Sequence, residues 1–195
     1  MTTTQVSVPR SPVRRALSSA GRSSAYCLVL LPLSAAAIAA ALAGRPGKAA
    51  GWWQVLRERL LGAEGGRIQG PTPAPRRSAV AGHAALSALL GAAALVPLGL
   101  EVLTVLRGLL YGLVDHGPYD HSWGGPTLAG AWLAHFAIGI PIIVAAALAL
   151  TGIAAVHQRL TAALAGRPRA PWVVPVALLA PLPAIAFFIA WLHQI

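Results

Sequence analysis

The stretch that decides the fold is AYCLVLLPLSAAAIAAALA, residues 25–43, which carries no charged side chain. A helix of this length, at about 1.5 Å per residue, covers the roughly 30 Å of hydrocarbon in a bilayer. The stretch therefore predicts a membrane-spanning helix. The ending ALA before Gly44 also resembles a signal-peptidase site, so a cleaved signal is the alternative. The length of the apolar run and its distance from the preceding arginines favour a retained span.

Three more apolar stretches follow, at about 80–103, 127–150 and 171–192. The whole chain of 195 residues is 56% hydrophobic and 10% charged, with a mean hydropathy of +0.67. A soluble domain needs more charge on the surface that it presents to water. We therefore predict an all-α membrane protein with four transmembrane helices, multi-pass in a cell membrane. The abundance of Arg, Ala and Gly suggests a bacterial source.

The start of the first apolar stretch divides the chain into a tail and a membrane domain. Residues 1–24 are basic and rich in Ser and Thr, which predicts a disordered tail. Residues 25–195 then form one integral membrane domain. In the first span, Ala35 and Ala39, like Ala36 and Ala40, are four residues apart. Such small-residue stripes predict the face on which a neighbouring helix approaches closely.

The connectors after the first and third spans resemble one another. In the first, WWQVLRERLLG (52–62) places Trp53, Leu56 and Leu60 on one helical face. Tryptophans beside arginines favour the membrane interface, so Trp52 and Trp53 are predicted anchors. The second connector contains HQRLTAALAGRP (157–168). We predict two interfacial amphipathic helices, and two tandem copies of span, interfacial helix and span.

An apolar hairpin that ends in LRERLLG or HQRLTAALAGRP resembles the multi-pass sensor domain family of actinobacterial membrane proteins. The likeness covers the chain loosely from Ser24 onward, and its motifs are short. In that family the domain often precedes a histidine kinase and also occurs alone. This chain has a short first apolar block and no phosphoacceptor helix or ATP-binding segment. The resemblance therefore implies a stand-alone sensing or adaptor module.

The net charge of +10 does not indicate a nucleic-acid-binding protein, because the arginines are gathered between apolar runs. This arrangement suits anionic lipid headgroups, which makes the bilayer the expected partner. Five of the 15 Lys and Arg residues fall on the face of the N-terminal tail and ten on the face of the two connectors. The positive-inside rule then predicts cytoplasmic connectors, although the arginines of the tail favour the reverse.

The loop DHGPYDHSWGG (115–125) repeats an Asp-His pair around a Gly-Pro turn. Carboxylates and imidazoles are ligands for Zn²⁺ and other divalent cations, so this loop is a candidate metal or proton-sensing site. The candidate ligands are Asp115, His116, Asp120 and His121. The alternative, which we favour, is a polar turn whose Tyr119 and Trp123 anchor at the headgroups.

Two ionisable residues, Glu101 and His135, lie in or near predicted spans, where a lone charge is costly. We consider that they form an intramembrane polar pair, or that Glu101 is simply hydrated at the interface.

No motif indicates a reaction, a phosphate loop or a catalytic triad, so we expect no enzymatic activity and no cofactor. The leading hypothesis is a non-enzymatic sensing or adaptor module. The alternative is a small transporter or permease component. A membrane kinase, a transporter subunit and a second copy of the chain are the conceivable protein partners.

Overall fold

The computed structural model describes residues 11–62 and 75–193, and every regular element in these ranges is helical. The elements are α1 (Pro12–Leu42), α2 (Pro46–Leu61), α3 (Arg77–Thr104), a π-helical turn η1 (Val105–Leu109), α4 (Tyr111–Val114), α5 (Leu128–Ala162), a 3₁₀ turn η2 (Ala163–Ala165), α6 (Val173–Leu179) and α7 (Pro181–Leu192). Four helical segments are long and apolar enough to cross a membrane: Pro12–Leu42, Arg77–Leu109, Leu128–Ala165 and Val173–Leu192. The predicted all-α class with four candidate spans is therefore confirmed.

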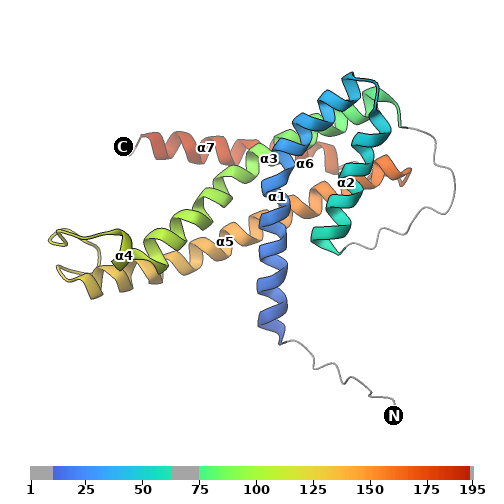
Figure 1. Cartoon of the computed structure of the whole chain (residues 1–195). Helices are drawn as coiled ribbons and strands as arrows, with labels where there is room; N and C mark the ends of the chain where they lie inside the picture. Colours follow the sequence, from blue (N-terminus) through green and yellow to red (C-terminus); the bar gives the residue numbers. More distant parts are fainter. Residues whose placement is uncertain (1–10, 63–74, 194–195) are drawn as a thin grey trace, which may run out of the picture.

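The helices meet at one end of the molecule and diverge from it. There α2 runs antiparallel to the last part of α1, beside the first half of α3, the end of α5 and α6 (Figure 1). The first half of α1, the paired α3 and α5, and α7 extend away in different directions (Figure 1). The buried core gathers where the helices cross, and its largest members are Tyr26, Leu30, Trp53, Leu90, Leu150 and Leu160.

The first helix begins earlier than the sequence predicted. Ser11 accepts a hydrogen bond from the backbone N–H of Arg14 at 3.3 Å, and Pro12 occupies the first helical position. A serine N-cap followed by proline is a favourable helix start, because both satisfy or remove unpaired N–H groups. The predicted disordered tail is thus wrong for residues 12–24, while residues 1–10 lie outside the described part of the chain.

The small-residue stripes of α1 do not form its buried face. Ala35, Ala36 and Ala39 are exposed, while Ala40 is half-buried and packs against the core. The buried positions instead follow a spacing of three and four residues: Ser23, Tyr26, Cys27, Leu30, Ser34, Ala37 and Ala41. The closest approach comes from α3, where a Cβ added to Gly91 would lie 2.8 Å from the backbone nitrogen of Leu31. The glycine of the partner helix, rather than the alanines of α1, permits this crossing.

The second predicted interfacial helix is absent from the described ranges, because its residues continue α5 to Ala162. His157, Leu160 and Thr161 are buried there rather than placed at a lipid surface. No glycine or proline occurs from His157 to Ala165, whereas Gly44 and Pro46 separate α1 from α2. The two connectors therefore differ in structure, and the tandem repeat stays a prediction.

At the opposite end, η1 and α4 continue α3 and pack against the first half of α5. The indole Nε1 of Trp132 donates to the carbonyl oxygen of Gly108 at 3.1 Å, and Tyr111 is buried. The segment that follows α3 is thus partly enclosed by protein. This packing fixes the two ends of the 115–127 loop.

Candidate functional site

The loop that the sequence singled out forms a local turn. The carboxylate of Asp115 accepts from the backbone N–H of Gly117 at 3.1 Å, and the Tyr119 hydroxyl donates to the carbonyl oxygen of Asp115 at 2.9 Å. Partial desolvation and the nearby Asp115 carboxylate raise the pKa of Tyr119, which keeps its hydroxyl a donor. These are the bonds of a polar turn.

The candidate metal ligands are not brought together. His116, Asp120 and His121 are exposed, while Asp115 is half-buried. Across residues 11–62 and 75–193, no group of three or more His, Cys, Asp or Glu side chains is placed to hold a metal ion. The arrangement favours the polar-turn interpretation over the metal interpretation.

We expect calorimetric titration of the purified protein with Zn²⁺ to give no more heat than titration of a His116→Ala/His121→Ala variant. The reason is that the four side chains would first have to rearrange around the ion, which costs conformational entropy. Heat that is specific to the wild-type loop would revive the metal hypothesis.

The predicted pair of Glu101 and His135 does not form. The Glu101 carboxylate accepts from the Ser24 hydroxyl at 3.1 Å. The His135 Nδ1 lies 2.8 Å from the carbonyl oxygen of Ala131, and its ring stacks on Tyr111 with centroids 4.2 Å apart. The residue beside His135 is Gly108 of η1, which lies about two helical turns beyond Glu101. Helix register therefore separates the two residues.

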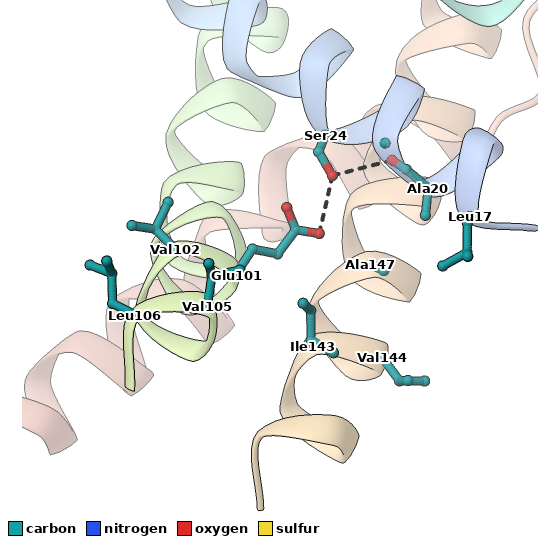
Figure 2. Close-up of a pocket in the computed structure, with 11 residues that line it drawn as sticks. Leu17, Ala20, Ser24, Glu101, Val102, Val105, Leu106, Ile143, Val144 and Ala147 are labelled. Carbon is teal, nitrogen blue, oxygen red and sulfur yellow. Dashed lines mark hydrogen bonds between the residues drawn. The ribbon is translucent and has the colours of Figure 1, made fainter. Parts of the chain in front are cut away.

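Glu101 instead lies in a groove formed by α1, α3 and α5, with a volume of about 540 Å³. Figure 2 shows its carboxylate reaching from α3 toward Ser24 of α1, with Ile143 and Ala147 of α5 beside them. The remaining lining residues are apolar or small, among them Leu17, Gly21, Val102 and Val144. The groove thus presents one carboxylate within hydrocarbon side chains.

The tryptophans of α2 have different environments. Trp52 is half-buried, with the ammonium of Lys48 5.8 Å from its ring centroid, which agrees with an interfacial position. Trp53 is fully buried, so the prediction that it anchors at lipid headgroups is wrong. The predicted apolar face is right, because Leu56 and Leu60 also pack on the core. That face contacts protein rather than lipid.

Trp123, the predicted anchor in the 115–125 loop, is 67% exposed at the other end of the molecule.

Beneath Trp53 lies a polar junction, which we define as Tyr26, His83, Ser87, His157 and Thr161. His157 is fully buried at its centre. Its Nδ1 lies 2.6 Å from the Tyr26 hydroxyl, and its Nε2 lies 2.8 Å from the Ser87 Oγ. The junction thereby joins α1, α3 and α5 through side-chain hydrogen bonds.

The direction of each bond in the junction follows from the acceptors that surround it. The Ser87 hydroxyl donates to the carbonyl oxygen of His83 at 2.7 Å, so its oxygen must accept from His157. Nε2 of His157 therefore carries the hydrogen, and Nδ1 accepts from Tyr26. Thr161 donates to the carbonyl oxygen of His157 at 2.8 Å, while its distance to Nδ1 is 3.4 Å. We infer a neutral His157 with one defined tautomer.

A second proton on His157 would disrupt this arrangement. Nδ1 would become a donor, and the buried Tyr26 hydroxyl would then lose Nδ1 as the acceptor for its hydrogen. An unpaired buried hydroxyl costs about 1–3 kcal/mol. The hydrogen bonds of His157 with Tyr26 and Ser87 therefore require a single protonation state of His157.

Aromatic packing connects the junction to α2. The Trp53 ring lies 5.3 Å from the His83 ring and 5.1 Å from the His157 ring, and the two imidazoles are 5.3 Å apart. Three buried nitrogens here have no hydrogen-bond partner within the described residues: Trp53 Nε1, Arg57 Nε and His83 Nε2. The contact between α2 and the spans is thus well packed but incompletely hydrogen-bonded.

Sequence reasoning missed the junction because its members lie on different helices and form no local motif. One signal was nevertheless present: His83 and His157 both lie near the connector ends of their spans, and therefore at the same face of the predicted membrane domain.

Comparison with known proteins finds no match: no family model, no curated protein and no solved structure is significantly similar to this chain.

Proposed function

We propose that this chain is a non-enzymatic integral membrane protein with a sensing or adaptor role, in which α2 is the element that changes position. The observation that carries the proposal is the burial of Trp53 of α2 over His83 and His157. A sensor needs two states of similar free energy that a signal can bias. The helix α2, either docked on the junction or released from it, is a candidate for such a pair of states.

The composition of α2 supports a second position for this helix. Its face with Trp53, Leu56 and Leu60 could enter the membrane interface as well as the protein core, and its other face carries exposed Lys48 and Arg59. An amphipathic basic helix of this kind is stable against anionic lipid. Release of α2 from the core therefore need not expose its apolar side chains to water.

The buried nitrogens without hydrogen-bond partners limit the stability of the state in which α2 is docked on the junction. Each buried donor without an acceptor costs about 1–3 kcal/mol relative to its hydrated form. Trp53 Nε1 and Arg57 Nε would regain partners among water and headgroups on release. Release would also uncover His83 and His157 for a protein partner, which accounts for an adaptor role.

The position of α2 can be tested with variants that retain only Trp53 or only Trp52, reconstituted with lipids brominated near the headgroup. We expect weak quenching of Trp53 and clear quenching of Trp52. Ala49 is buried one turn before Trp53, so Ala49→Leu should overpack the docked state by about 1–3 kcal/mol. Quenching of Trp53 should then rise to the level of Trp52.

The matched control is Val55→Leu, because Val55 lies on the same helix and is 45% exposed. It should leave the quenching of Trp53 unchanged. Strong quenching of Trp53 in the wild-type protein would contradict docking. Equally, if Ala49→Leu left Trp53 protected, or unfolded the spans together with α2, the helix would not be a separate two-state element.

A small transporter or permease component is the second candidate function. The observation in its favour is the Glu101 carboxylate, which lies within a candidate span. Solute flux through proteoliposomes would favour this role over sensing.

A further inference from the structure

The geometry points to a ligand-binding site in the groove between α1, α3 and α5, where Glu101 provides the counter-charge for a lipophilic organic cation. This inference concerns the binding of a ligand and does not require α2 to move, so it is independent of the proposed function.

The Glu101 carboxylate has fewer hydrogen bonds than it can accept. A carboxylate can accept about four hydrogen bonds. Within the described residues it receives one, from Ser24. The same Ser24 oxygen lies 3.2 Å from the carbonyl oxygen of Ala20, so its single hydrogen is shared between two acceptors. A cation in the groove would supply the missing interaction.

The charge of the lining residues also favours a cation. Glu101 is the one ionisable residue among the described residues that form the groove. The walls from α1 contribute Leu17, Ala20, Gly21 and Ser24, and those from α5 contribute Ile143, Val144 and Ala147. No cationic side chain among these walls competes for the carboxylate. An isolated negative charge within a span attracts positive charge strongly, because the surrounding hydrocarbon screens it poorly.

The size and chemistry of the groove favour an organic cation over an inorganic one. An inorganic ion such as Ca²⁺ requires six to eight oxygen ligands, and the groove offers one carboxylate and one hydroxyl. A volume of about 540 Å³ is instead in the range of small-molecule sites, which are mostly apolar with a few polar groups. An organic cation with its charge surrounded by hydrocarbon matches both the walls and the carboxylate.

A second groove provides an internal comparison. It lies between α3 and α7, has a volume of about 640 Å³, and is lined by apolar side chains that include Leu95, Phe188 and Trp191. No ionisable residue is found among its described lining. The two grooves are therefore similar in size and hydrophobicity. The groove between α1, α3 and α5 differs from the other in carrying the carboxylate of Glu101.

The experiment uses the full chain in nanodiscs of zwitterionic lipid, with tritiated tetraphenylphosphonium as the cationic probe and neutral triphenylphosphine oxide as its uncharged counterpart. We expect saturable binding of the cation and no saturable binding of the oxide. Glu101→Gln should weaken cation binding at least tenfold. Glu58→Gln, which removes an exposed carboxylate from α2, should leave it unchanged.

Two glycine substitutions separate the role of shape from that of charge. Gly21 in the Glu101 groove and Gly99 in the α3–α7 groove both have open space where a Cβ would lie. Gly21→Leu should fill the first groove and weaken binding at least tenfold, whereas Gly99→Leu should have no effect. These variants keep the carboxylate, so they test the site even if Glu101→Gln folds poorly.

Three results would overturn the proposal. They are equal binding of the cation and the oxide, unchanged binding in Glu101→Gln, and a loss of binding in Gly99→Leu instead of Gly21→Leu. The first would mean that the groove accepts any apolar molecule, such as a lipid chain.

Discussion

Replacing His157 with alanine is expected to lower the free energy of unfolding by about 3–5 kcal/mol. The substitution removes a fully buried ring on which Trp53 and His83 pack, and leaves a cavity. It also leaves the buried Tyr26 hydroxyl without its acceptor and removes the donor to Ser87. Denaturant unfolding in detergent, followed by circular dichroism, measures the loss. His116→Ala, at an exposed loop histidine, should change stability by less than about 0.5 kcal/mol.

A compensating substitution separates the hydrogen bond from the cavity. His157→Phe keeps the ring but still leaves the Tyr26 hydroxyl unpaired in the core. Adding Tyr26→Phe removes that hydroxyl, and replacing both partners of a buried hydrogen bond by apolar groups is nearly neutral. The double variant should therefore be more stable than His157→Phe alone. Strictly additive losses would show that Tyr26 and His157 do not act as a pair.

Substituting Gly91 with alanine is expected to destabilise the protein by about 1–3 kcal/mol, toward the upper end of that range. The added Cβ would lie 2.8 Å from the backbone nitrogen of Leu31 and 3.1 Å from its Cα. These atoms belong to helix α1 and cannot move aside as a flexible side chain can. The two helices would have to separate at their crossing, which would also strain the hydrogen bond between Tyr26 and His157.

The matched control is Gly82→Ala in the same helix. Gly82 is exposed, and no heavy atom lies within 4 Å of the position of its Cβ. Alanine is favoured over glycine inside a helix by about 0.5–1 kcal/mol, so this variant should be more stable than the wild type. Opposite signs for the two substitutions are expected in the same unfolding assay. A stabilising Gly91→Ala would mean that α1 and α3 do not cross closely at this point.

The amino-acid sequence by itself determined the class of the protein and the approximate position of its spans. A bilayer demands about 20 successive apolar residues and satisfied backbone hydrogen bonds, and both demands act on local sequence. The four candidate spans therefore lie close to the stretches that hydropathy selected. The apolar face of α2 was predictable for the same reason, because amphipathicity is a property of a single helix.

Tertiary structure decided which side of each helix faces protein. A soluble helix marks its buried face by hydrophobic periodicity, but a span is apolar all round because lipid and protein core are equally apolar. The exposed face of Ala35 and Ala39 thus resembles the buried face of Ala37 and Ala41 in composition. The pattern of α2 likewise suits lipid and core alike, which is why the burial of Trp53 could not be predicted.

The candidate sites required tertiary structure for a related reason. Tyr26, Ser87 and His157 lie on three helices, and Glu101 meets Ser24 instead of His135 only because of the register between α1, α3 and α5. Register depends on side-chain packing at crossings such as Leu31 and Gly91, where a single missing Cβ sets the distance between two backbones. The sequence determined which stretches are long and apolar enough to span a membrane, and the packing of the helices decided which of their residues meet.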